Sequence, residues 1–197
     1  NGRDVVGNTA STAYSFTFEV VPPKDFQLQV VPGWNLISFP SRPATTDINT
    51  IFSNPAIRTV MTYDPSDVRG PWLVAPRGSD GKLGTAQLSQ VDEQHAYWVE
   101  ATSFVSLSVT VPRQTGLVQP PSIRIIRGWN LVPVIDLSIS SAGTNIPIST
   151  YLGTVTWQFA YSYDTTTNTW TRITSGGNVQ VGRGYWVWAT ADGVLVP

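Results

Sequence analysis

Apolar and polar side chains alternate along much of this chain, and the alternation predicts strands rather than long helices. In residues 12–21 the apolar positions are Tyr14, Phe16, Phe18 and Val20. A period of two predicts a half-buried strand, because successive side chains of a strand point to opposite faces. Pro22 and Pro23 end this strand, since proline has no amide hydrogen to donate to a neighbouring strand. The same alternation over residues 26–30 predicts the next strand.

Three landmarks occur twice in the chain, in the same order. They are Gly33-Trp34-Asn35-Leu36 and Gly128-Trp129-Asn130-Leu131, Tyr63-Asp64 and Tyr163-Asp164, and Tyr97-Trp98-Val99 and Tyr185-Trp186-Val187. The spacing between landmarks differs between the copies, as expected when loops vary on a shared scaffold. The chain is therefore predicted to be a tandem duplication.

A short helix is predicted in each copy, between the first and second landmarks. Asp47 precedes the apolar residues Ile48 and Ile51 and is a favourable helix N-cap. Tyr151 and Leu152 occupy the equivalent place in the second copy. The predicted fold class is all-β, with two tandem homologous domains, sandwich-like or barrel-like, each carrying one short helix, plus an N-terminal strand. The expected boundaries are 1–23 for the N-terminal strand segment, 24–114 for the first β-module and 115–197 for the second.

Together these landmarks resemble a small β-module, often in tandem, that occurs near the ends of large secreted and surface proteins of bacteria and archaea. The first copy departs from the pattern at its last element, where His95-Ala96 replaces Arg183-Gly184. The resemblance implies a fold and no activity of its own. Residues 7–20 resemble the closing strand of a bacterial immunoglobulin-like repeat. Residues 1–23 are therefore expected to end a preceding domain of that kind or to join another subunit.

Composition narrows the partners and the location. Only 13% of residues are charged and the formal net charge is −1, so no basic stripe is present for nucleic acid or an anionic membrane. No apolar run is long enough to span a membrane in this segment. Cysteine is absent, which excludes disulfides and thiolate chemistry. Abundant Thr, Ser, Val, Gly and Pro, with little Lys and Glu, is typical of extracellular β-modules and predicts a secreted or cell-surface location.

Candidate catalytic groups are few. His95 is the only histidine, and the second copy has Arg183 near the corresponding place, so a role for His95 as general base or metal ligand is not favoured. The carboxylates lie mostly in turns, where aspartate ordinarily accepts hydrogen bonds from nearby backbone amides. No catalytic residue and no cofactor are predicted, and the chain is expected not to be an enzyme.

Two turns contain paired oxygen donors that could hold calcium. Asp64 and Asp67 form one pair, and Asp164 and Asn168 form the other. Calcium normally takes six to eight oxygen ligands, and neither turn is acidic enough to supply them. Stabilisation of the turn by the side chain itself is the favoured interpretation, with calcium as the alternative.

Eight tryptophans carry the remaining functional signal. Trp34, Trp98, Trp129 and Trp186 belong to the duplicated landmarks and are predicted to lie in the core. The candidate sugar contacts are Trp72, Trp157 and Trp170, which lie near turns, although core packing is the alternative for these too.

The function expected from these observations is that of a non-catalytic structural or adhesive module in a prokaryotic surface layer, filament or appendage. The strand of Tyr14, Phe16, Phe18 and Val20 is the candidate joint, pairing with a neighbouring domain or an identical subunit. The alternative is a carbohydrate-binding accessory domain of a secreted polysaccharide-degrading enzyme, with a glycan as partner.

Overall fold

The computed structural model describes residues 22–67, 69–84, 87–112 and 121–197, and strands dominate this part of the chain. The prediction of an all-β fold with short helices is confirmed. The elements are β1 (Lys24–Val30), β2 (Gly33–Ser38), α1 (Ile48–Ile51), β3 (Ile57–Tyr63), β4 (Trp72–Pro76), β5 (Ala96–Ala101), β6 (Val105–Val111), β7 (Ile123–Ile125), β8 (Gly128–Val132), β9 (Asn145–Pro147), α2 (Ile148–Tyr151), β10 (Trp157–Asp164), β11 (Thr169–Ile173), β12 (Asn178–Gln180), β13 (Tyr185–Ala189) and β14 (Gly193–Leu195).

The same strand order appears twice. A four-stranded antiparallel sheet has the order β2-β5-β3-β4, and its counterpart has the order β8-β13-β10-β11. Each is accompanied by a two-stranded sheet, β1-β6 in one case and β7-β14 in the other. Even an irregularity is repeated, since the pairing shifts between Ile57 and Thr59 of β3 and between Trp157 and Phe159 of β10. We call β1–β6 the first module and β7–β14 the second module.

The Gly-Trp-Asn-Leu landmark owes its residues to a local hydrogen-bond clamp. Gly33 and Gly128 have φ angles of 101° and 109°, a region that favours glycine because it has no Cβ. The buried Asn35 side chain accepts a hydrogen bond from Val31 N at 3.0 Å and donates to Val31 O at 2.8 Å and Gly33 O at 3.0 Å. Asn130 makes the same three bonds to the residues four and two positions before it. The asparagine thus fixes the turn that enters β2 or β8.

The tyrosine of the last landmark has an equally specific contact. Tyr97 and Tyr185 are buried, and their hydroxyl oxygens accept hydrogen bonds from Asp92 N at 2.8 Å and Gln180 N at 2.7 Å. Each tyrosine therefore anchors the backbone five residues before it. Burial raises the pKa of both phenols above their ordinary value, so they remain protonated.

Both short helices are present where the sequence predicts them. In α1 the Asp47 side chain accepts a hydrogen bond from Thr50 N at 2.7 Å, which is the expected N-cap contact. In α2 the N-cap residue is Pro147, which has no such side-chain bond. The tertiary contacts of Ile148 and Tyr151, both buried, therefore have a larger part in holding α2.

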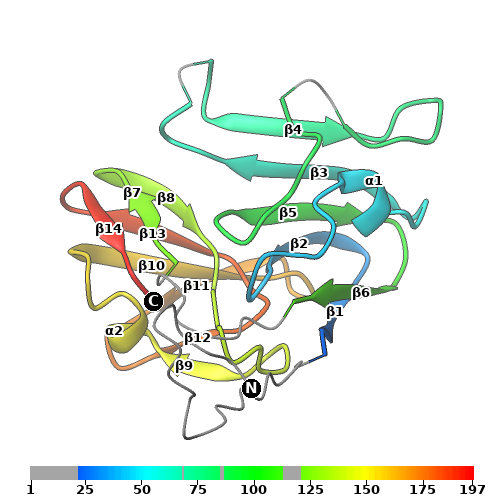
Figure 1. Ribbon diagram of the computed structural model, residues 1–197. Coiled ribbons are helices and arrows are strands. Elements are labelled where there is room, and N and C mark those ends of the chain that lie inside the picture. Colours follow the sequence, from blue (N-terminus) through cyan, green and yellow to red (C-terminus); the bar gives the residue numbers. More distant parts are fainter. Residues whose placement is uncertain (1–21, 68, 85–86, 113–120) are drawn as a thin grey trace, which may run out of the picture.

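The two four-stranded sheets face each other, one above the other in Figure 1. This arrangement explains the unusual burial of β2. Ile37 belongs to the main apolar cluster and Asn35 is buried, whereas Leu36 belongs to a second cluster that also contains Leu131 of β8. A strand between two cores is buried on both faces, which an alternating pattern does not predict.

Backbone hydrogen bonds also join the modules along one seam. Ser38 N donates to Gly182 O at 3.0 Å, and Gly184 N donates to Leu36 O at 3.3 Å. The fully buried Ser38 hydroxyl donates to Arg183 O at 2.8 Å and accepts from Val134 N at 3.0 Å. The end of β2 is thereby fixed to the segment that precedes β13.

The predicted strand containing Tyr14, Phe16, Phe18 and Val20 lies outside the described residues, and it remains a prediction.

Candidate functional site

Aromatic rings interlock across the junction of the two modules. Trp98 of β5 contacts Tyr163 and Trp170 of the second module, with ring centroids 4.9 and 5.7 Å apart. Trp186 of β13 makes the equivalent contacts in the opposite direction, to Tyr63 and Trp72 of the first module, at 4.8 and 5.8 Å. All four contacts are close to edge-to-face, which is a favourable geometry for aromatic pairs. The duplicated indoles therefore hold the two modules together.

The Tyr-Asp landmark and the tryptophan after it are explained by the same contacts. Tyr63 lies opposite Trp72 in the β3–β4 pairing, and Tyr163 lies opposite Trp170 in the β10–β11 pairing. The ring centroids are 5.1 Å apart in both pairs. The indole of Trp186 thus packs against the tyrosine and tryptophan of the β3–β4 hairpin, and the indole of Trp98 packs against those of the β10–β11 hairpin.

The second module carries three further aromatic residues on this face. At the positions where the first module has Thr59, Met61 and Glu100, the second has Phe159, Tyr161 and Trp188. The equivalence follows from the pairing registers, since Thr59 and Phe159 lie opposite Glu100 and Trp188, while Met61 and Tyr161 lie opposite Trp98 and Trp186. Because the first module forms the same sheet without these rings, the fold does not require them.

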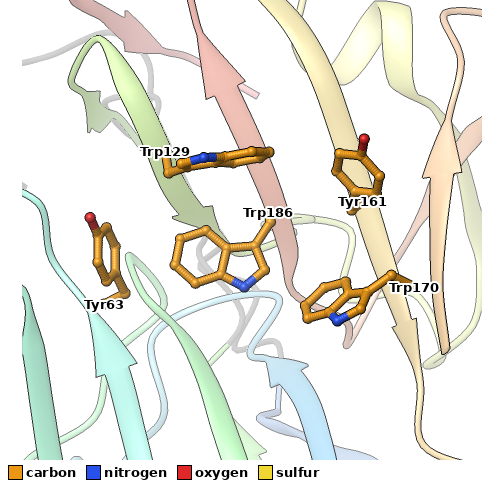
Figure 2. Close-up of a pocket in the computed structure, with 5 residues that line it drawn as sticks. All are labelled: Tyr63, Trp129, Tyr161, Trp170 and Trp186. Carbon is orange, nitrogen blue, oxygen red and sulfur yellow. The ribbon is translucent and has the colours of Figure 1, made fainter. Parts of the chain in front are cut away.

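Four rings of the second module and one of the first enclose an open recess of about 390 Å³. The lining residues are Tyr63, Trp129, Tyr161, Trp170 and Trp186. Figure 2 shows Trp186 in the middle of the group, with Trp129 seen edge-on above it and the other rings around it. We call this site the aromatic recess. Every residue that lines it is aromatic, and none carries a formal charge.

The rings of the aromatic recess meet at steep angles. The planes of Trp129 and Trp186 are perpendicular, at 90° with centroids 6.2 Å apart. Tyr63 meets Trp186 at 63°, and Trp129 meets Tyr161 at 54°. These rings form a floor and walls, in contrast to the coplanar rings of a flat platform.

The tryptophans proposed from the sequence do not all lie together. Trp170 lines the aromatic recess and is 47% exposed. Trp72 occupies the equivalent place on the β3–β4 hairpin and is 42% exposed, but it does not line the recess. Trp157 is partly buried against the main core, near α2. The structure thus separates Trp157 from the other two.

One core assignment made from the sequence is wrong. Trp98 is buried, as predicted, with 7% of its surface exposed, but Trp129 is 38% exposed and lines the aromatic recess. Trp34 and Trp186 are half-buried at the junction. The reason is that the first sheet covers only part of the facing surface of the second, and Trp129 lies on the uncovered part. The signal that could have indicated this site was the excess of aromatic residues in the second copy at positions such as Tyr161.

His95 lies at a second, more polar cleft of about 210 Å³, and its Nδ1 is 2.7 Å from Asp92 Oδ1. Partial burial lowers the pKa of His95, but the hydrogen bond and charge of Asp92, with Asp64 and Glu93, outweigh it and raise the pKa above its ordinary value. Partial burial raises the pKa of Asp92, and the contact with His95 outweighs this effect and lowers it. The pair therefore favours the charged forms of both groups.

The groups around this cleft do not form a nucleophilic triad. Ser66 also lines the cleft, but its hydroxyl donates to Asp64 Oδ1 at 2.6 Å. No hydrogen bond joins Ser66 to His95, as a serine nucleophile and its general base would require. The His95–Asp92 pair is an interaction within one turn of the chain.

The two candidate calcium turns use their side chains within the turn. Asp64 Oδ1 accepts from Ser66 N at 2.8 Å, and Asp67 forms a two-bond contact with Arg69. Asp164 accepts from the amides of residues 166 and 167. Asn168 accepts from the Tyr163 hydroxyl. In the described part of the chain, no group of three or more His, Asp or Glu side chains is placed to hold a metal ion.

Two further observations are not confined to these sites. Among the described residues, no helix has the length and apolar character needed to cross a membrane. Comparison with protein-family models, with curated proteins and with solved structures gives no match.

Proposed function

We propose that this chain is a non-catalytic structural and adhesive module of an extracellular prokaryotic assembly such as a surface layer, filament or appendage. The observation that carries the proposal is the junction. Aromatic interlocking and the hydrogen bonds of Ser38 combine two small modules into one body. A rigid spacer needs this kind of joint, because a flexible linker would let the modules reorient independently.

The low charge and the abundant Thr, Ser, Gly and Pro support the extracellular location, as in other β-modules that pack by apolar and aromatic contacts. In this proposal the partner is a neighbouring domain or an identical subunit, joined through the strand that the sequence predicts at residues 14–20.

Electron microscopy with labelled antibodies on the source cells tests the location, and native mass spectrometry of extracted material tests the assembly. We expect labelling of the cell envelope and masses that are multiples of a repeating unit. Removal of residues 1–21 should reduce assembly if the predicted strand joins another subunit, or lower the melting temperature of residues 22–197 if it pairs within the chain. Intracellular labelling, or a deletion that changes neither assembly nor melting temperature, contradicts the proposal.

The exposed indoles favour a second candidate, a carbohydrate-binding accessory domain of a secreted polysaccharide-degrading enzyme. Trp170 and Trp129 present exposed ring surfaces on different sides of Trp186 around the aromatic recess, and exposed ring faces can stack on sugars. A glycan array tests this candidate. Binding that is lost in Trp170→Ala and kept in Trp157→Ala supports it, and an array without signal counts against it.

A further inference from the structure

The duplication of the modules and the packing of the core do not account for all the aromatic residues that line the aromatic recess. Three rings of each module serve the junction, and both modules carry them: Tyr63, Trp72 and Trp98 in the first, and Tyr163, Trp170 and Trp186 in the second. Tyr161 is different, because the first module has Met61 at the same place in the sheet and forms the same junction. Trp129 is 38% exposed, and its ring contacts are with Tyr161, Trp186 and Trp188 of its own module. These two rings therefore complete a site on the second module.

The composition of the lining restricts the ligand. A bound sugar would lose water from its hydroxyl groups, and a specific site replaces that water with carboxylate, amide or guanidinium partners. The aromatic recess has none of these side chains in its lining. Arg172, on the neighbouring strand β11, is already stacked over Phe159 at 4.8 Å and does not line the site.

The ring angles restrict the ligand further. Stacking along the flat face of an extended polysaccharide is served best by ring faces that lie in one plane, whereas Trp129 and Trp186 are perpendicular. In Figure 2 the Trp129 ring is seen edge-on above the Trp186 ring, so the π-faces of differently oriented rings border the same recess. Those faces carry partial negative charge, and their electrostatic complement is a compact cation. A trimethylammonium group meets this description best, because it is positive, has an apolar surface and has no hydrogen atoms that need acceptors.

We propose that the aromatic recess binds the trimethylammonium group of a choline-type small ligand. Trp186 forms the floor, while Trp129, Tyr161, Tyr63 and Trp170 form the walls. The volume of about 390 Å³ leaves room for the ammonium group and its short carbon chain. This inference concerns the recess alone and does not depend on the structural role proposed above.

Titration with choline chloride, followed through the eight indole N–H signals in NMR spectra, tests the proposal on the full chain. We expect saturable shifts centred on Trp129, Trp170 and Trp186, with a dissociation constant on the order of 1 mM. The matched probe is 3,3-dimethylbutan-1-ol, which has the same shape as choline and no charge. It should bind about tenfold more weakly, since only the cation gains from the ring faces.

Variants locate the site and separate binding from folding. Tyr161→Met installs the residue that the first module tolerates at the equivalent position. It should weaken choline binding roughly threefold to tenfold with little change in melting temperature. Trp170→Ala should weaken binding by a similar factor. Trp157→Ala removes an indole that packs near α2, away from the recess, and it should leave the affinity within about twofold of the parent chain.

Four outcomes overturn the proposal. One is equal binding of choline and its neutral isostere, which marks a merely apolar pocket. Another is a loss of affinity in Trp157→Ala equal to that in Trp170→Ala. The third is saturable binding of cellohexaose or chitohexaose at the same indoles without a response to choline, which identifies a sugar site. The fourth is a trimethyllysine peptide that binds far more tightly than choline, which identifies a peptide partner.

Discussion

Replacement of the landmark asparagines by alanine should destabilise the chain strongly and to a similar extent in both modules. Asn130 makes three hydrogen bonds of 2.7–3.0 Å to backbone groups, and Asn35 makes the same three plus a longer one of 3.3 Å to Val99 O. A typical hydrogen bond contributes a net amount of about 1 kcal/mol, and its loss leaves buried backbone groups without partners. Each substitution should therefore lower the free energy of unfolding by about 3 kcal/mol.

Urea unfolding followed by circular dichroism measures this loss. For a chain of this size, 3 kcal/mol corresponds to a fall of roughly 6–12 °C in melting temperature. Asn35→Asp is an informative companion, because it keeps the shape and the acceptor but cannot donate to Val31 O or Gly33 O. It should destabilise the chain about as much as Asn35→Ala at neutral pH. Asn178→Ala, at an exposed position of β12, serves as the control and should change the stability by less than about 0.5 kcal/mol. A loss below about 1 kcal/mol for both landmark asparagines would refute the clamp as the reason for their recurrence.

Three further predictions concern the junction and the polar cleft. Trp98→Ala should lower the free energy of unfolding by about 3–5 kcal/mol in urea titrations, because it empties the buried half of the interlock, and the exposed Trp72→Ala should cost clearly less. Equal losses for the two variants would argue against the interlock. Ser38→Ala should cost about 1–3 kcal/mol, because Val134 N loses its acceptor in a buried place, and thermal unfolding should show the loss directly. The raised pKa of His95 means that its contact with Asp92 stabilises the fold fully below the unfolded value of 6.5 and is lost as the pH rises through the folded value. The urea midpoint should therefore fall as the pH rises above 6.5 and through the raised pKa of His95, and His95→Gln should remove this part of the pH dependence. A profile that is the same in the variant and the parent would exclude the pair as its source.

Much of the fold could be predicted from local signals. The alternation at residues 26–30 corresponds to β1, where Phe26, Leu28 and Val30 are buried. Asp47 as an N-cap predicted α1. These features depend on residues close together in the chain, which is why pattern and spacing are sufficient to find them.

The candidate site was predicted only in part. Trp170 was named from its place near a turn, and it lines the aromatic recess. Trp129 was assigned to the core because it repeats Trp34, and this assignment was wrong. Tyr161 was not singled out, although its counterpart Met61 is not aromatic. A repeat shows which residues two modules share, but it does not show which surface of one module the other leaves open.

The sequence by itself determined the strands, the short capped helix and the repeated landmarks of this protein, because a glycine at positive φ, an asparagine clamp or a period of two acts over a few residues. Only the tertiary structure decided what the indoles do. Trp34 and Trp129 lie in the same four-residue motif, yet one is half-buried at the junction and the other lines an exposed recess. The difference arises from the packing of one sheet on part of the other. This packing depends on residues far apart in the sequence, such as Trp98 and Tyr163, and on the backbone seam at Ser38.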